Sequence, residues 1–481
     1  MFGIIFIGSL LMSCSNMMTS TMSLEYKFLH TIFMLIGVGL LGFILQVLSN
    51  NKKAQIGAVI MTIVGVNLYI SNPHTPLDPN IKLVANAELL IKIEHAHKKG
   101  ISNKVLNFSF VQGLNALSTP KDSEVTTLDD YFKVDIIPDF DVNNAIANIS
   151  NVEGVEWIEA NEVLRQKPLE ELKKNNEIDQ VRGDKFSASV NDPMSARQWN
   201  MEVLEMEKFY NLFTLNKFRP KKRAKLFILD SGVNARHEDL NLNFVSHPSI
   251  DKSENESDVN GHGTHCAGVA GAITNNGVGV ASMSPGAQYY SISSIRVMNN
   301  FGFGSQAQII EGIIEAVDAG ADVISMSIGG QSNQVKEEAY EEAVQYAQLH
   351  NVIIVAAAGN NSGDAAKIVP ASSDKIIAVS ALDKTLKKAQ FSNFITNTNY
   401  GIAAPGVSIL STWKSGRYAA FDGTSMATPH VAGLLATLKS LKPNLTTKQA
   451  FEILERTGKP TKETNLTGKM INPAAAVLSI R

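Results

Sequence analysis

Runs of apolar residues without polar alternation constrain the fold of this chain more than any other feature. Such runs are typical of parallel strands covered on both faces, because a strand with one solvated face alternates apolar and polar residues. They lie in the C-terminal part of the sequence, at residues 225–229, 322–326, 352–356 and 376–380. Helical stretches, for example 306–319 and 334–349, lie between them. The alternation predicts an α/β fold with a doubly wound, mostly parallel sheet over residues 191–481, and a functional site at the carboxyl ends of its strands.

Composition limits the classes of function to consider. The chain has 481 residues, of which 44% are hydrophobic and 19% charged, an ordinary balance for a protein of two or three globular domains. A formal net charge of −3 gives no reason to expect a nucleic-acid partner. The two cysteines, Cys14 and Cys266, predict a fold that disulfides do not hold together, with Cys266 as a packed free thiol.

The N-terminal residues 1–75 are predicted to be a membrane anchor or targeting region. Residues 28–48 carry no formal charge and would form a helix of about 30 Å, enough to cross the hydrocarbon core. The apolar run at 56–70 is shorter, about 22 Å, so it either crosses the bilayer or is re-entrant. Lys52 and Lys53 favour a cytoplasmic loop between the two. If both segments cross, the later domains face outward.

Other interpretations of this region stay open. The apolar residues 2–13 resemble the core of a signal peptide without its basic flank, and Cys14 stands where a lipoprotein would be processed. If the apolar N-terminus is only a targeting segment, it is removed from the mature protein. A helical hairpin inside a soluble protein is a further alternative.

A small α+β domain of the ferredoxin-like type is predicted between residues 84 and 166. Its expected strands lie at 89–94, 131–136 and 154–159, with a helix at 141–149. The following residues 167–190 are charged and polar, which is typical of an exposed linker and of a proteolytic processing site.

Polar residues with catalytic potential follow the predicted strands or begin the predicted helices. Asp230 follows a strand, His262 and Ser425 begin helices, and Asn360 comes directly after another strand. Taken singly, each has a structural explanation: an Asp-Ser-Gly turn, a buried histidine, a helix cap or a Gly-Asn turn. We assign the structural histidine role to His265. Together, an acid, an imidazole, an amide and an alcohol at one edge of a sheet predict nucleophilic catalysis.

The sequence around these residues resembles the subtilisin-like serine peptidases. The blocks that carry the resemblance are Asp230-Ser-Gly, His262-Gly-Thr-His, Ser327-Ile-Gly-Gly330, Ala358-Gly-Asn360 and Gly423-Thr-Ser-Met-Ala-Thr-Pro-His430. The resemblance implies that Ser425 attacks the scissile carbonyl, that His262 moves its proton, and that Asp230 orients the imidazole. It also implies that the Asn360 amide stabilises the oxyanion.

The resemblance further implies a substrate cleft and a structural calcium site. The cleft would use extended edges at Gly302, Gly304, Ser327, Ile328 and Gly329, to which a peptide adds as a strand. The primary pocket is expected to prefer large apolar residues, or a basic residue if Asp364 lies within it. Calcium would be held by Asp192, Asp239 and Asn276, with Gln198 as a further contact. The alternative is an Asn-Gly turn without a metal.

These expectations combine into a serine endopeptidase made as a membrane-associated precursor. Residues 84–166 resemble the inhibitory prodomain of the family, and the peptidase domain is expected outside the cytoplasm. The implied partners are polypeptide substrates, the chain's own prodomain and membrane lipid, with no nucleic acid. The alternative is a catalytically silent, membrane-tethered binding or regulatory protein on the same fold.

Overall fold

The computed structural model describes residues 84–165 and 190–480, apart from 119, 124–125, 139, 215–217, 242, 246–257 and 333. The segments at 28–48 and 56–70, and nearly all of the 167–190 linker, lie outside the described residues. Within the described ranges, no helix combines the length and the apolar character that a membrane crossing needs. The chain divides into two compact units, and the second contains residues 92–98, 115–132 and everything from Val163 onward.

The first unit is built on a β-α-β-β-α-β succession, the order of the ferredoxin-like motif. Its elements are β1 (Val84–Ile93), α4 (Lys98–Leu106), β2 (Val111–Ala116), β3 (Tyr131–Ile136), α5 (Val142–Ile149) and β4 (Val155–Arg165), with β2-β3-β1-β4 as the strand order. The strands and the helix predicted here are confirmed. Sequence analysis missed α4, whose nine residues include Gly100 and bury only Ile101 and Val105, so its apolar pattern is weak.

The second unit is centred on a six-stranded parallel sheet in the order β13-β12-β10-β8-β5-β6. These strands are β5 (Ala224–Asp230), β6 (Tyr290–Arg296), β8 (Val323–Met326), β10 (Ile353–Ala357), β12 (Ile377–Leu382) and β13 (Gly401–Pro405). The prediction of a doubly wound parallel sheet is confirmed. Strand β6 was missed because three serines interrupt its apolar residues, although all three are buried.

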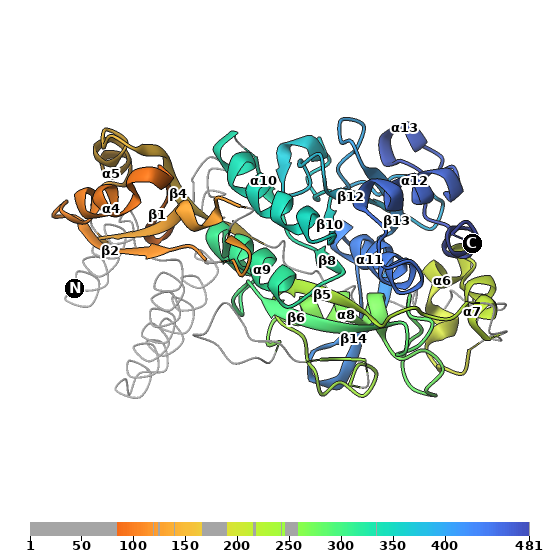
Figure 1. The fold of residues 1–481 in the computed structure, drawn as a ribbon. Helices are drawn as coiled ribbons and strands as arrows, with labels where there is room; N and C mark the ends of the chain where they lie inside the picture. The colour runs from red at the N-terminus through yellow and green to blue at the C-terminus, as the bar shows by residue number, and fades with distance from the viewer. Residues whose placement is uncertain are drawn as a thin grey trace, which may run out of the picture. The chain divides into compact units, whose positions relative to one another are not determined.

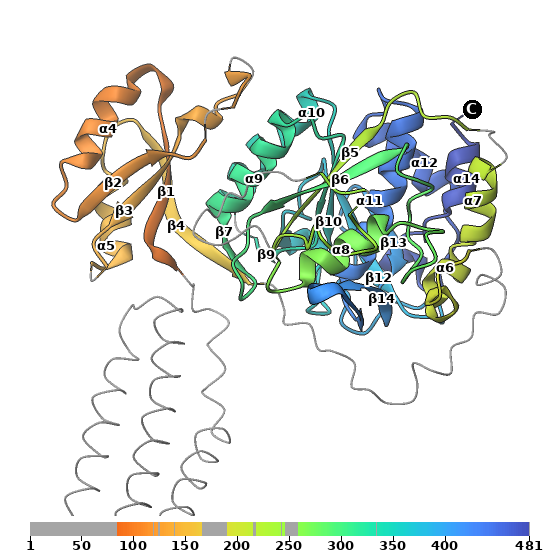
Figure 2. The same cartoon turned by 90° about the horizontal axis from the view of Figure 1, so that it is seen from below.

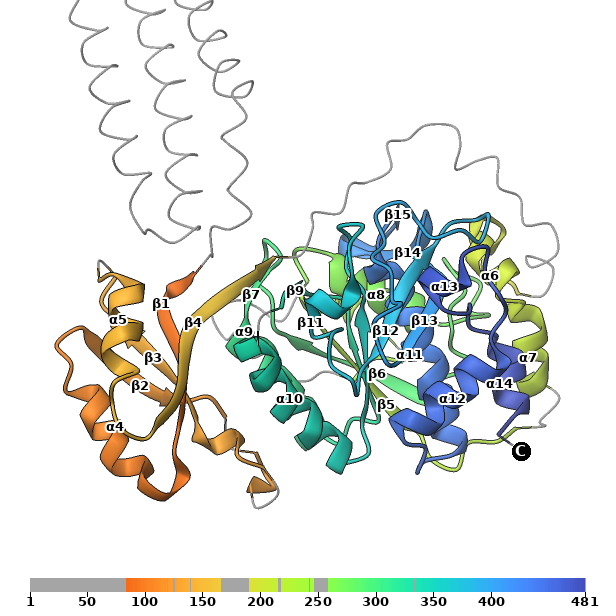
Figure 3. The ribbon, with the colours of Figure 1, turned by 90° about the horizontal axis from the view of Figure 1, so that it is seen from above.

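Helices cover both faces of this sheet. Figures 1, 2 and 3 show α9 (Gln306–Asp318) and α10 (Gln334–Leu349) on one face, and α11 (Thr424–Leu441) on the other. Helix α8 (His262–Gly271) packs against α11. The remaining elements are α6 (Trp199–Val203), α7 (Met206–Thr214), β7 (Phe303–Ser305), β9 (Gly330–Gln331), β11 (Ile368–Val369), β14 (Ile409–Trp413), β15 (Arg417–Phe421), α12 (Thr447–Thr457), α13 (Thr464–Thr467) and α14 (Pro473–Leu478).

The strand order fixes where a ligand can reach the sheet. From β5 the chain moves outward to β6 and then returns to β8 on the other side of β5. The strand order therefore reverses between β5 and β8, and in open α/β sheets ligands bind outside the carboxyl ends of strands at such a reversal. Asp230 ends β5 and Ser327 follows β8, so both lie beside this crevice.

Helix α11 is completely enclosed in the second unit. Every residue from Thr424 to Leu441 is buried, so the helix is fixed all round by its neighbours. It packs tightly against them at Gly433, where a Cβ atom would lie 2.6 Å from Met283 Cβ and 2.7 Å from the Ala270 carbonyl oxygen. Because real Cβ atoms do not come so close to their neighbours, only glycine fits here.

This contact predicts a destabilising effect of Gly433→Ala. The added methyl group forces α11 away from the main chain of α8, and we expect a loss of about 1–3 kcal/mol of unfolding free energy, typical of overpacking. Urea denaturation followed by tryptophan fluorescence measures the change. Gly363→Ala is the matched control, because a Cβ there meets nothing closer than 3.6 Å. Equal midpoints for the two variants would contradict the prediction.

Candidate active site

Asp230 and His262 form a buried pair at the carboxyl end of β5. Both carboxylate oxygens of Asp230 lie 2.9 Å from His262 Nδ1, and the two side chains are 0% and 1% exposed. This contact holds the ring nitrogen Nδ1 as the donor, which makes Nε2 the basic nitrogen. Burial alone would lower the pKa of His262, but the charge of Asp230 and the contact with Cys266 outweigh it and raise the pKa well above its usual value.

Glycines bring these two side chains together. Helix α8 starts at His262 after Gly261, whose φ of +100° is a left-handed conformation that glycine adopts without strain. A Cβ atom on Gly263 would lie 2.0 Å from the carbonyl oxygen of Gly232. The first turn of α8 therefore rests directly on the turn that follows β5, which places the imidazole against the carboxylate.

Ser425 is the second residue of α11, as the sequence predicts for a serine at a helix N-terminus. Its hydroxyl donates to the carbonyl oxygen of Ser327 at 3.1 Å, and the Ser327 hydroxyl donates to the carbonyl oxygen of Ser425 at 2.8 Å. This reciprocal pair ties the start of α11 to the residue that follows β8. Ser425 is 7% exposed, so it is almost enclosed but accessible from the crevice.

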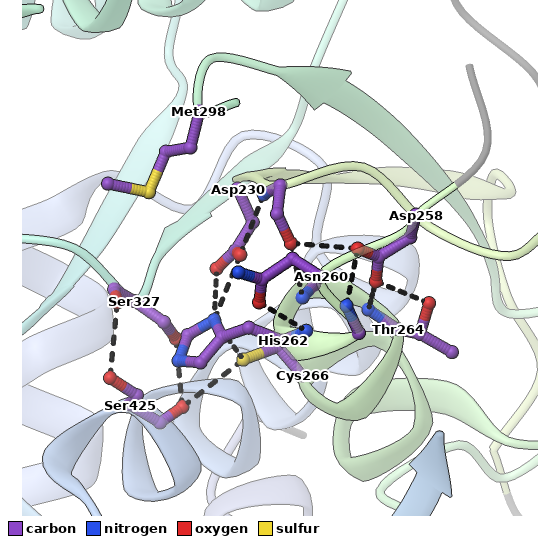
Figure 4. Close-up of polar contacts among 12 residues, drawn as sticks. Asp230, Asp258, Asn260, His262, Thr264, Cys266, Met298, Ser327 and Ser425 are labelled. Atoms are coloured by element: carbon purple, nitrogen blue, oxygen red, sulfur yellow. Dashed lines mark hydrogen bonds and ion pairs between the residues drawn. The ribbon is translucent and has the colours of Figure 1, made fainter. Parts of the chain in front are cut away.

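Cys266 shows that the histidine and the serine share one site. Its sulfur lies 3.8 Å from His262 Nδ1 and donates to the carbonyl oxygen of Ser425 at 3.5 Å (Figure 4). The thiol is fully buried, and burial raises its pKa. A protonated, packed thiol is therefore expected, in agreement with the sequence prediction. The predicted acid, imidazole and alcohol all meet at the edge of the sheet between β5 and β8.

Asn360, the predicted oxyanion donor, lies beside the start of α11. Its side-chain oxygen accepts hydrogen bonds from the backbone N–H of Thr424 at 2.8 Å and from the Thr424 hydroxyl at 2.9 Å. With the oxygen anchored next to Ser425, the opposite end of the amide carries the N–H donors that an oxyanion requires. Sequence analysis missed Thr424, whose contribution is to orient this amide.

One of the two predicted substrate edges, the one at β7, carries a peptide strand. Within the second unit, Val163–Arg165 pairs antiparallel with β7, with Leu164 opposite Gly304. At Gly330, the first residue of β9, a Cβ would lie 2.1 Å from Leu164 Cδ2, so the leucine occupies the space that this glycine leaves. The edge that contains Gly302 and Gly304 therefore accepts an added strand. Ile328 is 2% exposed and Gly329 packs against Ile368.

The predicted calcium ligands converge on one loop. Both oxygens of Asp192 accept from the backbone, at Asn275 and Asn276, and Asp239 accepts from the Asn276 side chain at 2.8 Å. The residue Gly279 approaches so closely that a Cβ would lie 2.4 Å from Asp239 Oδ2. The side-chain oxygen of Gln198 instead accepts a hydrogen bond from the backbone N–H of Ala281, at 2.8 Å.

The electrostatics of this loop suit a divalent cation. Burial, with a smaller contribution from the charge of Asp192, raises the pKa of Asp239 to about 7, and burial also raises the pKa of Asp192. In the part of the chain that the structure describes, neither carboxylate pairs with a lysine or arginine. Two buried carboxylates on one loop, with the Asn276 amide beside them, supply the hard oxygen ligands that calcium prefers.

His265 has the structural role that the sequence predicts. It is fully buried, and its Nε2 lies 3.0 Å from the Ile409 carbonyl oxygen and 3.1 Å from that of Ala419. Burial lowers its pKa to about 3, so it stays neutral. Besides Thr424, sequence analysis missed Ser231 and Asp258, whose side chains bond to each other between β5 and α8. Figure 4 shows Asp258 near the start of α8. The available signal was an aspartate placed just before a helix start, a capping pattern.

Comparisons with known proteins agree with this geometry. Residues 221–472 match the Subtilase family. The chain is 39% identical to thermitase of Thermoactinomyces vulgaris over 252 residues, covering 52% of this chain and 85% of thermitase. It is 38% identical to subtilisin DY of Bacillus licheniformis over 261 residues, 53% of this chain and 90% of that protein.

A solved structure of a protease from Pseudoalteromonas arctica PAMC 21717 shares the fold. It superposes with a TM-score of 0.53 at 28% identity, covering 61% of this chain and all of that one. Together with the matched family region, these similarities establish the class of the protein. The chain belongs to the subtilase family and is a serine-type endopeptidase.

Proposed function

We propose that this subtilase cleaves polypeptides through an acyl-enzyme on Ser425 and is made as a prodomain-inhibited, membrane-associated precursor. The observation that carries the catalytic part is the Asp230–His262 pair, buried beside the serine at the start of α11. An orienting carboxylate, a base and a nucleophile gathered at one site are the groups that serine hydrolysis requires.

The chemistry follows from these contacts. A rotation about the Cα–Cβ bond of Ser425 turns its hydroxyl from the Ser327 carbonyl towards His262, whose Nε2 takes the proton as the oxygen attacks the substrate carbonyl. Asp230 accepts from Nδ1–H and stabilises the imidazolium that forms. His262 then passes the proton to the leaving amine as the C–N bond breaks. A water molecule releases the acyl group by the same steps in reverse order.

Oxyanion stabilisation is assigned to Asn360 and the start of α11. The negative charge develops on the carbonyl oxygen as the new C–O bond forms. The backbone N–H of Ser425 lies in the first turn of a helix, where amide groups have no intrahelical acceptor and the helix dipole favours negative charge. The Asn360 amide, fixed at its oxygen end by Thr424, provides the second donor.

Substrate is proposed to bind as an added strand. The supporting observation is the Val163–Arg165 segment, which pairs with β7 through main-chain groups. Such pairing takes affinity from backbone hydrogen bonds and specificity from side-chain pockets. Leu164 against Gly330 indicates that one of these pockets accepts a branched apolar side chain.

The same segment supports the precursor hypothesis. It is the C-terminal end of β4, within the residue range 84–166 that is predicted to be the prodomain, and it occupies the edge at which substrate is proposed to bind. We place the processing site in residues 167–190 and the peptidase domain at 191–481. The membrane association rests on the apolar sequences at 28–48 and 56–70, and with both crossing the bilayer the peptidase domain lies outside the cytoplasm.

The catalytic assignment predicts the outcome of labelling with a fluorophosphonate probe. The probe should react with the wild-type enzyme after removal of residues 1–187, and should not react with Ser425→Ala, because this variant lacks the hydroxyl that His262 is proposed to activate. Ser440→Ala in the same helix is the control, since the Ser440 hydroxyl only bonds to the Thr437 carbonyl. No labelling of the processed wild type would instead support a silent binding protein.

The calcium proposal predicts a pH-dependent stabilisation. Without metal, the pKa of Asp239 is about 7 in the folded protein and about 4 in the unfolded chain. The folded protein therefore holds this proton more tightly, and its stability falls as the pH rises between these two values. Calcium needs the ionised form and removes this penalty. We therefore expect calcium, compared with a chelator, to raise the melting temperature by several degrees at about pH 8 and much less at about pH 5.

Asp239→Asn should abolish this calcium response and raise the stability of the metal-free protein at high pH, as measured by calorimetry. The half-buried Asp383, whose carboxylate bonds within its own turn, offers the control Asp383→Asn, which should respond to calcium like wild type. A calcium response that survives in Asp239→Asn argues against this site.

The precursor hypothesis predicts an effect of Leu164→Glu in the full-length chain. The glutamate places a charge in the buried site beside Gly330 and so weakens the docking of Val163–Arg165. Losing the burial of one leucine side chain costs about 1.5–3 kcal/mol of docking free energy, which corresponds to roughly a tenfold or greater increase in the accessibility of the cleft. The measurement is the rate of fluorophosphonate labelling of the unprocessed protein, which should increase. Leu106→Glu, at an exposed site on α4, should leave the rate unchanged.

A further inference from the structure

We propose that Asp258 is a positioning residue for catalysis, which together with Ser231 fixes the first turn of α8 against the end of β5 and so sets the orientation of His262. The inference rests on the catalytic roles proposed above for Asp230, His262 and Ser425. The Asp258 carboxylate bonds to Ser231, Gly261 and Thr264, not to the reacting atoms. It acts through the two elements that carry the acid and the base.

The carboxylate of Asp258 collects four hydrogen bonds from both of these elements. Its Oδ1 accepts from the Ser231 hydroxyl at 3.0 Å and from the backbone N–H of Gly261 at 2.7 Å. Its Oδ2 accepts from the backbone N–H and the hydroxyl of Thr264, at 2.8 and 2.6 Å. The side chain is buried, with 4% of the residue exposed. Figure 4 shows these polar contacts of Asp258. These donors flank Asp230 on one side and His262 on the other.

Ser231 completes the link between the two catalytic side chains. Its backbone N–H donates to Asp230 Oδ1 at 2.7 Å, and its hydroxyl oxygen accepts from the N–H of Gly263 at 3.1 Å while donating to Asp258. One residue therefore contacts the catalytic carboxylate, the helix that carries the imidazole, and the buried anion that caps this helix. A shift at Asp258 is transmitted to both members of the pair.

The geometry requires a carboxylate rather than another acceptor. All four groups that face Asp258 are donors, and an ionised carboxylate is the side chain with two acceptor oxygens and no proton of its own. An asparagine of the same shape would turn an amide N–H₂ towards at least one backbone N–H, leaving a buried donor without an acceptor. A negative charge beside the unpaired N–H groups at the start of α8 also matches the helix dipole.

Positioning of this kind matters because catalysis is sensitive to small displacements. The proton must pass between Ser425 and His262 at hydrogen-bonding distance, and a misplacement of about 1 Å can cost on the order of a hundredfold in rate. Asp230 and His262 come from elements separated in the chain by residues 231–261, so their mutual geometry depends on what joins β5 to α8. The Asp258 carboxylate is the anion at this junction.

The test compares Asp258→Asn, Ser231→Ala and the double variant with wild type. Active sites are counted with an irreversible serine-directed inhibitor, so that kcat refers to folded enzyme alone. We expect Asp258→Asn to lower kcat by about tenfold to a hundredfold and Ser231→Ala by several-fold, with KM changed less than about threefold. The double variant should lose little more than Asp258→Asn, because both changes break the same link.

Asp383→Asn is the control for removal of a hydrogen-bonded aspartate, and its kcat should equal that of wild type because Asp383 lies in an exposed turn. A kcat within twofold of wild type in Asp258→Asn, or fully multiplicative effects in the double variant, would overturn the inference. If Asp258→Asn gives no folded enzyme, Ser231→Ala decides, since it keeps the carboxylate: unchanged kcat overturns the proposal. An inactive wild type would overturn the proposed function instead.

Discussion

The contact between two stretches of main chain, Gly232 and Gly263, sets the distance between the catalytic acid and base. With only 2.0 Å between a hypothetical Cβ on Gly263 and the Gly232 carbonyl oxygen, no side chain fits between β5 and the start of α8. The carboxylate at the end of the strand and the imidazole at the start of the helix are then forced into hydrogen-bonding contact. The rest of the second unit holds this contact in place: the parallel sheet fixes β5, and the enclosed helix α11 brings Ser425 to the same edge.

Two histidines in α8 have opposite pKa shifts because their hydrogen-bond partners differ. His262 and His265 are both buried in α8, yet the pKa of the first is raised and that of the second is lowered to about 3. Burial disfavours the charged form of both. His262 has the Asp230 carboxylate to offset this cost, whereas His265 faces carbonyl oxygens of Ile409 and Ala419. One ring is therefore suited to accept a proton, and the other is a fixed structural donor.

The sequence predicted those parts of the structure that depend on local pattern. Continuous apolar runs predicted β5, β8, β10 and β12. Asp230 and Asn360 were predicted as site residues because they lie at or just after the ends of two of these strands. It did not predict α4, where a glycine weakens the apolar pattern, or β6, where buried serines interrupt it. The role of Asp258 and the pairing of Val163–Arg165 with β7 were also beyond reach, because each depends on residues brought together only by the folded chain.

Strand β7 has three residues, and its length has a consequence for the solubility of the enzyme. Under the proposed maturation, Val163–Arg165 leaves β7, and β7 then loses its neighbour β4 in the described sheet. Unpaired strands of this kind are where separate molecules can join into aggregates. An edge this short offers few backbone groups to another copy, and natural proteins use very short edge strands to avoid such association. If the precursor is processed as proposed, the short length of β7 therefore also limits association between processed molecules.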